Sequence, residues 1–244
     1  MVAEESRSGA AGLHVVSPDG PLYRIARPPD PWSWPNWANI GPDGTLGNRW
    51  DDPEAVYRVL YASSSPLGAL MEVLARFRPD PHILSAFKEI EVEGSSSFPL
   101  PGDLDPSWVE NRCLGVAEVD GEFVDVGHSR SLATLREALT SRIVHYGLDD
   151  LDAAAVRLSA PRRFTQEISR YVYDQSTSEG RRRFAGIAYR SRLGDEFQNW
   201  AIFESLDDPS WAVGPETQPL EADDPDLIQA LKRLGVRLHR DRKT

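Results

Sequence analysis

The order of the predicted strands and helices constrains this chain more than any single motif. Short apolar runs typical of strands alternate with turns and amphipathic helices at irregular intervals, without the regular rhythm that builds a parallel sheet. This order favours a mixed α+β domain over a doubly wound sheet, and no linker divides the chain into comparable halves. We expect strands at residues 22–25, 56–62, 87–92, in two runs within 115–126, and at 186–189 and 200–203.

Turn and cap residues predict how these elements begin and end. Ser65 can cap a helix that starts at Pro66 and carries Glu72. The dipeptide Asp120-Gly121 is typical of a tight turn, so the two runs around it predict a hairpin. Further helices are expected from a cap at Ser129 or Ser131 to residue 146, and over residues 162–175 and 226–234.

Residues 28–37 alternate prolines with tryptophans and can form neither a helix nor a central strand. We therefore predict a long loop rich in aromatic side chains. Its tryptophans, together with one further along the chain, could line a ligand cleft or could attach the loop to the core. The four residues concerned are Trp32, Trp34, Trp37 and Trp50.

Charge and composition exclude several functions. The 27 Lys and Arg against 38 Asp and Glu give a formal net charge of −11, so we expect no direct binding of nucleic acid and no membrane association. No apolar run is long enough to span a bilayer. The only cysteine, Cys113, cannot form an internal disulfide, and we find no pattern of a signal peptide. We therefore expect a cytoplasmic protein.

Motifs for phosphate-binding loops, dinucleotide-binding turns and zinc sites are absent, and the five histidines are scattered, so we predict no metal site. Residues 127–131 (GHSRS) match the nucleophile elbow of serine hydrolases except at the last position. We favour a helix cap there over a nucleophile. Arg181, Arg182 and Arg183 form the most basic run, which we interpret as a surface turn in preference to a phosphate site.

Five short motifs follow one another in an order that is more specific than any one of them. They are Leu22-Tyr23-Arg24-Ile25, Gly47-Asn48-Arg49-Trp50-Asp51-Asp52-Pro53, Leu60-Tyr61-Ala62-Ser63 followed by Glu72, Gly186-Ile187-Ala188-Tyr189-Arg190-Ser191, and Asn199-Trp200-Ala201-Ile202-Phe203. The set resembles the RES domain family, whose name records Arg, Glu and Ser signature residues, over about residues 22–204. Asn48 and Asp51 depart from the usual Gly and Asn, and the added charge of Asp51 could alter phosphate contacts. The long Trp/Pro loop is the second departure, and it could reshape the substrate entrance.

The resemblance implies a fold and a function. RES proteins are similar in fold to ADP-ribosyltransferases, which implies an ADP-ribosyltransferase-like domain with a curved, antiparallel-rich sheet flanked by helices. Most are bacterial toxins that consume NAD and are held by an antitoxin with an Xre-like helix-turn-helix domain. The resemblance thus implies NAD as substrate, no cofactor, and such an antitoxin as partner, and it leaves a homodimer open. The implied catalytic residues are Glu72, Tyr61 and Arg24, and the implied substrate-binding residues are Arg24, Arg49, Tyr61 and Ser191.

These residue types suit the implied chemistry. Nicotinamide leaves NAD as a neutral molecule, so the reaction needs no general acid, and one carboxylate, that of Glu72, can stabilise the oxocarbenium-like transition state. Arg24 and Arg49 offer planar forks to a pyrophosphate. The ring of Tyr61 can lie against the flat nicotinamide, and Ser191 can supply a hydroxyl contact.

The leading hypothesis is a toxin that degrades NAD by cleaving the nicotinamide–ribose bond, through hydrolysis or phosphorolysis. An ADP-ribosyltransferase that modifies a protein or nucleotide, and an inactive NAD-binding or interaction module, stay open as alternatives. Water, phosphate and an acceptor would all approach the same anomeric carbon, so the sequence does not separate them. We expect a disordered tail (1–12), a RES-like domain (13–208) and a C-terminal extension packed on it (209–244).

Overall fold

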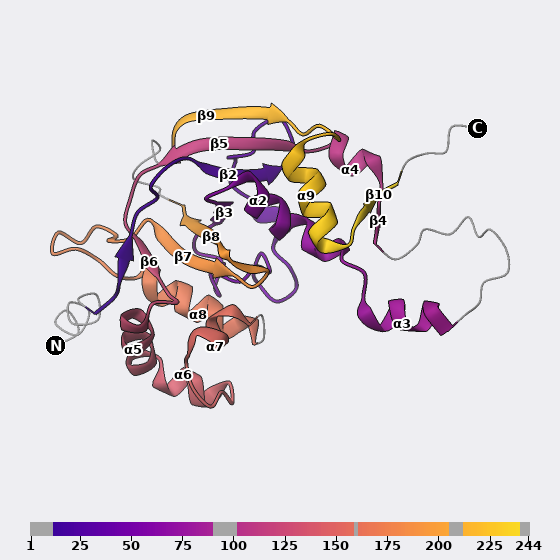
Figure 1. Ribbon diagram of the computed structural model, residues 1–244. Coiled ribbons are helices and arrows are strands. Elements are labelled where there is room, and N and C mark those ends of the chain that lie inside the picture. Colours follow the sequence, from indigo (N-terminus) through magenta and orange to yellow (C-terminus); the bar gives the residue numbers. More distant parts are fainter. Residues whose placement is uncertain (1–11, 90–101, 159–160, 205–211, 240–244) are drawn as a thin grey trace, which may run out of the picture.

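An eight-stranded sheet forms the centre of the computed structural model, which describes residues 12–89, 102–158, 161–204 and 212–239. The strands lie in the order β1-β6-β7-β8-β3-β2-β5-β9, and every neighbouring pair is antiparallel except β6 and β7. They are β1 (Val15–Val16), β2 (Leu22–Ala26), β3 (Val59–Ser63), β5 (Cys113–Val119), β6 (Phe123–Asp125), β7 (Gly186–Ser191), β8 (Gly194–Phe203) and β9 (Ala212–Pro219). The sheet curls into a half-barrel (Figure 1), which confirms the predicted mixed α+β fold with a curved, antiparallel-rich sheet.

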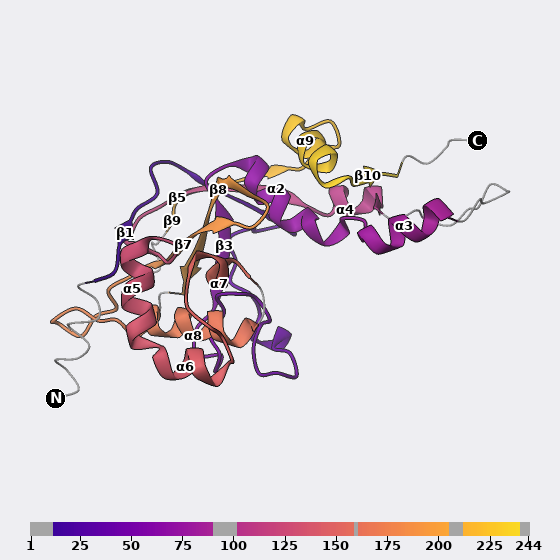
Figure 2. The same ribbon diagram turned by 60° about the horizontal axis from the view of Figure 1, so that its bottom comes forward.

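The helices form two groups around this sheet. They are α2 (Pro66–Leu74), α3 (Pro81–Glu89), α4 (Pro106–Glu110), α5 (Ser129–Ala138), α6 (Thr140–His145), α7 (Ala153–Arg157), α8 (Arg162–Tyr173) and α9 (Pro225–Leu234), with two short 3-10 turns at Trp37–Asn39 and Ala75–Phe77. Helices α5 to α8 gather below β6 and β7, whereas α2 and α9 lie side by side at the other end of the sheet (Figures 1 and 2). A short parallel pair, β4 (Asp103–Leu104) with β10 (Arg237–Leu238), lies beside α9.

Each helix group has its own part of the hydrophobic core. The amphipathic face predicted for residues 162–175 packs Phe164, Ile168 and Val172 of α8 against the sheet. At the other end, Leu70 and Leu74 of α2 share a second cluster with the apolar face of α9. The side chains of both clusters are almost entirely removed from water, which is the main favourable contribution to the fold.

The hairpin predicted at Asp120-Gly121 is wrong. Strands β5 and β6 do follow one another around Gly121, whose φ of +135° suits a glycine, but they do not pair. Strand β5 is bonded on both edges, by β2 and by β9, and β6 lies between β1 and β7. No edge of β5 is free to accept β6, so the chain crosses to the other end of the curled sheet.

Several predicted boundaries also need correction. Residues 87–89 belong to α3 and not to a strand, because Asp80 and Pro81 start a helix there: the Asp80 carboxylate accepts from the His82 amide at 2.7 Å. Residues 90–92, the rest of that prediction, lie outside the described residues. The helix expected up to residue 146 is split at Leu139 into α5 and α6. Strand β3 starts at Val59, because residues 53–58 form the turn that follows the Trp50 segment.

Residues 212–239 add an edge strand to the sheet and a helix that packs beside α2. Strand β9, which the sequence analysis missed, is the edge strand beside β5 and is exposed along most of its length. Helix α9 starts where predicted, because the Asp224 carboxylate accepts from the amides of Asp226 and Leu227. It ends at Gly235, whose φ of +67° provides the left-handed cap.

Candidate active site

A pocket of about 430 Å³ opens over the middle of the sheet, between β2, β3, β7, β8 and α2. Its floor contains one row of opposing residues: Tyr23 of β2 pairs with Ser63 of β3, Ser63 with Asn199 of β8, and Asn199 with Tyr189 of β7. Opposing residues of neighbouring strands lie on the same face of a sheet, so the register brings together residues that are up to 176 positions apart in the sequence, from 23 to 199.

Among the described residues, the pocket wall has a single carboxylate, that of Glu72, and helix α2 supplies it. The helix forms as predicted, since the Ser65 hydroxyl accepts from the Gly68 amide at 3.1 Å and Pro66 is its first residue. The face that includes Leu70 and Leu74 is buried in the core, and another face turns Glu72 and Val73 toward the pocket. Ala69 lies at the boundary, since it belongs to the core and also lines the pocket. The helical period therefore explains why Glu72 faces the pocket while Leu70 and Leu74 face the core.

Two buried side chains hold the Glu72 carboxylate in place. The Ser191 hydroxyl donates to Glu72 Oε1 at 2.5 Å, and Asn199 Nδ2 donates to the same oxygen at 2.8 Å. Ser191 lies outside the pocket wall and is 1% exposed, and its Oγ also accepts from the Leu193 amide at 3.0 Å. The structure thus places Ser191 as a support for Glu72, where the sequence analysis expected a contact with substrate. Glu72 Oε2 accepts no hydrogen bond from any described residue, so it stays available to a ligand.

Arg24 lines the pocket from β2, but part of its guanidinium group is already occupied. Nε donates to the Pro31 carbonyl at 2.8 Å and Nη1 to the Tyr61 carbonyl at 2.7 Å. Through these two bonds, Arg24 links the Trp/Pro loop, which contains Pro31, to strand β3, which contains Tyr61. Burial lowers the pKa of Arg24 to about 10, which leaves it a cation at neutral pH. Three of its five N–H groups are left for a ligand.

Arg49 lies on the turn before β3 and reaches the pocket without a partner for its charge. Its Nη1 atom is buried and forms no hydrogen bond within the described residues. The guanidinium group lies over the Tyr189 ring, 5.7 Å from the ring centre. Burial lowers the pKa of Arg49, and the Tyr189 phenol and the Glu72 carboxylate act in the opposite direction. A buried cation with an unpaired N–H is costly, and an anionic ligand would satisfy it.

Asp51 fixes this turn and the ring of Tyr61. Its Oδ2 accepts from the Asn48 amide at 2.6 Å and from Asn48 Nδ2 at 3.0 Å, and its Oδ1 accepts from the Tyr61 hydroxyl at 2.8 Å. The Tyr61 oxygen also accepts from the Trp50 amide at 3.0 Å. Burial raises the pKa of Asp51 and raises that of Tyr61 well above its ordinary value. Asp51 is 2% exposed and outside the pocket wall, so its charge is used within the turn and does not face a ligand as expected.

The pocket wall also contains residues that the sequence did not assign to the site. Among them are three arginines and two polar side chains of the sheet floor: Arg76, Arg162, Arg192, Tyr189 and Asn199. Arg76 carried a usable signal, because it lies four residues after Glu72, in the 3-10 turn that directly continues α2. Arg162 and Arg192 carried none, since each lies in a segment that only the tertiary fold brings near Glu72. None of the pocket arginines forms an ion pair with another residue in the described part of the chain.

The other candidate residues lie elsewhere. None of the four tryptophans lines the pocket. Trp32 and Trp50 are buried, so Trp32 attaches the Trp/Pro loop to the core and Trp50 attaches the turn before β3. His128 caps α5, where a serine was expected, and Ser131 is fully buried with its Oγ accepting from the His14 amide. The basic run of residues 181–183 contacts other side chains of the protein. Arg181 pairs with Glu179, and the guanidinium groups of Arg182 and Arg183 lie over the rings of Tyr173 and Phe184.

The described residues form neither a metal centre nor a membrane-spanning helix. They contain no group of three His, Cys, Asp or Glu side chains placed to hold a metal ion. They also contain no helix with the length and apolar character needed to cross a bilayer.

The fold and the pocket define a mixed α+β domain with a cationic pocket built around a single carboxylate. The model of the RES domain matches residues 21–223, most of the chain, and the protein therefore belongs to the RES domain family. At the level of the family, this membership supports an NAD-related, toxin-like domain. No curated protein matches the sequence.

Proposed function

We propose that this protein cleaves the nicotinamide–ribose bond of NAD. The observation that carries the proposal is the composition of the pocket: one carboxylate, Glu72, held by two hydrogen bonds, and five arginines that have no ion-pair partner in the described part of the chain. A pocket of this kind favours an anionic ligand, and the pyrophosphate of NAD supplies two negative charges. The resemblance in the sequence and the family membership point to the same ligand.

The arginines provide the binding side of the reaction. Arg24 and Arg49 lie on two different elements and face one pocket, so a pyrophosphate could accept from both guanidinium groups. Their burial strengthens such contacts, because water screens charges less in a site of low dielectric constant. The rings of Tyr61 and Tyr189 form apolar surfaces in the same wall, on which the flat nicotinamide can stack.

Glu72 provides the catalytic side. When the bond between the ribose C1′ and the nicotinamide nitrogen breaks, its electron pair goes to the nitrogen, nicotinamide leaves neutral, and positive charge develops on the ribose. A carboxylate already fixed by Ser191 and Asn199 stabilises that charge without having to reorient. Attack by water then gives ADP-ribose and one proton, and attack by phosphate gives ADP-ribose 1-phosphate.

Cleavage of NAD would make the protein toxic to the cell that produces it. We therefore propose a bacterial toxin whose partner is an Xre-like antitoxin that covers the pocket. A carboxylate of such a partner is the natural mimic of the pyrophosphate, since the same guanidinium forks bind both. The net charge of −11 means that binding of an operator would come from the partner.

The test is the release of nicotinamide from NAD by the purified protein and by the Glu72→Gln variant. Loss of one preorganised charged group should lower turnover by about 100-fold or more, while the fold is kept because Gln has nearly the volume of Glu. Glu167→Gln is the matched control: Glu167 accepts from Tyr146 and pairs with Arg142 on the α6–α8 side, outside the pocket, and its loss should leave turnover unchanged.

The products distinguish the alternatives. Free ADP-ribose in phosphate-free buffer indicates hydrolysis, a phosphate requirement indicates phosphorolysis, and ADP-ribose attached to another molecule indicates a transferase. Binding of NAD without release of nicotinamide would identify an inactive module. A Glu72→Gln variant with wild-type turnover would refute the proposed role of Glu72.

A further inference from the structure

One atom of the pocket has no role in the proposal above. The side-chain oxygen of Asn199, Oδ1, is buried and forms no hydrogen bond within the described residues. Asn199 is 1% exposed and lies in the pocket wall, in the middle of β8. A buried amide oxygen without a donor is unfavourable, so a ligand that brings a donor would gain free energy at this point.

The neighbouring carboxylate fixes which way the amide of Asn199 lies. Glu72 Oε1 can only accept, so the group at 2.8 Å from it must be the NH₂ of Asn199 and not its oxygen. The opposite orientation would place two acceptors against each other. Asn199 Oδ1 is therefore held on the far side of that amide, still within the pocket wall, and the Ser191 hydroxyl completes the support of Glu72.

Two neighbouring side chains of the pocket wall thus each keep one acceptor, Glu72 Oε2 and Asn199 Oδ1, and neither oxygen has a donor among the described residues. A pair of rigid acceptors matches a pair of rigid donors on the ligand. In a dinucleotide, the two neighbouring hydroxyls of a ribose are such a pair, whereas the carboxamide of nicotinamide combines a donor with an acceptor.

We propose that Asn199 forms a ribose subsite with Glu72, in which Asn199 Oδ1 accepts a hydrogen bond from one hydroxyl of the cis-diol beside the bond to be cleaved. This inference rests on the proposed function for the identity of the ligand. In this subsite, Asn199 has two roles: its Nδ2 supports the Glu72 carboxylate, and its Oδ1 selects ligands that carry the ribose hydroxyl. Discrimination by a buried acceptor is strong, because a ligand without the hydroxyl leaves that acceptor unsatisfied.

Two ligands that are not cleaved test this subsite. ADP-ribose carries the second ribose and ADP does not, and both carry the pyrophosphate and the adenosine. In calorimetry, Asn199→Leu should weaken the binding of ADP-ribose about tenfold and leave the binding of ADP unchanged. The affinity for ADP also reports that the variant is folded and that its arginines are in place.

A second background separates direct contact from support of Glu72. In Glu72→Gln protein, adding Asn199→Leu should still weaken ADP-ribose binding, because the amide oxygen of the substituted side chain can still accept from Asn199 Nδ2 and so keeps Oδ1 in the same orientation. The matched control is Gln175→Leu, which removes another buried amide oxygen without a partner, at a position outside the pocket. It should leave the ratio of the two affinities unchanged.

Three outcomes would overturn the subsite: equal losses for ADP and ADP-ribose, no loss for ADP-ribose, or an effect that disappears in the Glu72→Gln background. If NAD binding to the Glu72→Gln protein falls with Asn199→Leu while ADP-ribose binding does not, the oxygen contacts nicotinamide and the ribose assignment is wrong. Absence of nicotinamide release by the wild-type protein would refute the proposed cleavage alone, because these affinities are measured without turnover.

Discussion

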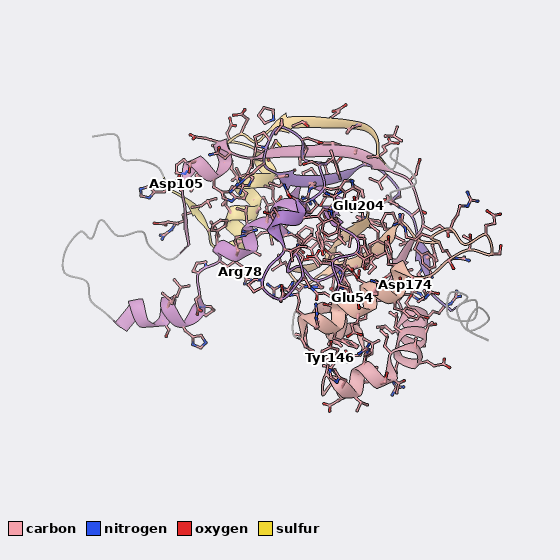
Figure 3. The ribbon with its side chains drawn as sticks, turned by 180° about the vertical axis from the view of Figure 1, so that it is seen from behind. Glu54, Arg78, Asp105, Tyr146, Asp174 and Glu204 are labelled. Carbon is pink, nitrogen blue, oxygen red and sulfur yellow. The ribbon has the colours of Figure 1, made fainter. Side chains whose placement is uncertain are left out.

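The arginines of the pocket and the arginine at the end of α8 show two different uses of the same side chain. Arg170 contacts three carboxylates, with Nη1 at 3.2 Å from Asp52 and 3.4 Å from Glu54, and Nε at 2.9 Å from Asp174. Glu54 and Asp174 are labelled in Figure 3, in the same part of the molecule. In the pocket, five arginines share the wall with one carboxylate and none of them has an ion pair within the described residues.

The difference shows what each region contributes. Around Arg170, cations and carboxylates compensate each other, and the buried Asp52 makes this cluster part of the fold. In the pocket, Arg24 and Arg49 are desolvated cations without a carboxylate partner among the described residues, whereas Arg76, Arg162 and Arg192 are exposed to solvent. The cost of desolvating the first two is expected where a ligand provides the missing charge. The acidic surface makes the contrast stronger, because carboxylates are abundant elsewhere in this chain.

We expect the largest effect on stability from a substitution of Arg170. Arg170→Met removes the cationic partner of the Asp52 carboxylate, whose side chain is fully buried, and leaves the Val56 amide as its one donor among the described residues. We therefore expect a loss of about 3 kcal/mol in unfolding free energy. Urea denaturation measures this loss, and calorimetry should show unchanged ADP affinity. Arg136→Met is the control: it removes an exposed pair with Asp150 and should cost less than about 1 kcal/mol. Equal losses for the two variants would mean that the cluster around Arg170 adds nothing to stability.

Arg49→Met should have the opposite pattern. It removes a buried N–H without a partner, so the unfolding free energy should stay the same or rise. It also removes charge-assisted contacts to the pyrophosphate, so ADP affinity should fall about thirtyfold, equivalent to about 2 kcal/mol. Calorimetry and thermal unfolding on the same sample measure both quantities. Wild-type affinity for ADP would show that Arg49 does not bind the ligand.

We expect the smallest effect, on both nicotinamide release and stability, from a substitution of Asp51. Asp51→Asn can keep the turn, since one amide oxygen accepts from Asn48 and the NH₂ can donate to the Tyr61 oxygen. We expect nicotinamide release within about threefold of the wild type and an unfolding free energy within about 1 kcal/mol at pH 5. A large loss of activity would show that the charge of Asp51, and not only its geometry, is needed.

The pH dependence gives this variant its own signature. Burial raises the pKa of Asp51 in the folded protein, so above its ordinary pKa the folded state still holds a proton that the unfolded state has lost. The contribution of Asp51 to stability therefore decreases as pH rises from its ordinary value, near 4, through the raised one. Asp51→Asn should remove that decrease. Urea denaturation at several pH values checks it, and identical slopes for both proteins would contradict the assignment.

Part of the site could be predicted because its signals are local. Ser65 and Pro66 start a helix, and the helical period then places Glu72 on the face opposite Leu70 and Leu74. The ordered motifs pointed to Arg24, Arg49 and Tyr61, which the structure brings to one pocket. Ser191 was associated with the site for the wrong contact, since whether a hydroxyl bonds to a ligand or to a carboxylate depends on a residue 119 positions away.

The class of fold, the Ser65 cap of α2 and the apolar faces of the helices could be read from local patterns, because each depends on residues a few positions apart. Three outcomes depended on contacts between distant segments: β5 and β6 do not pair, Arg162 and Arg192 join the pocket, and Asn199 holds Glu72. Those outcomes depend on which strand edges are free and on which face of the curled sheet a side chain lies. Both are set by hydrogen bonds and packing between distant segments, and no local pattern records them.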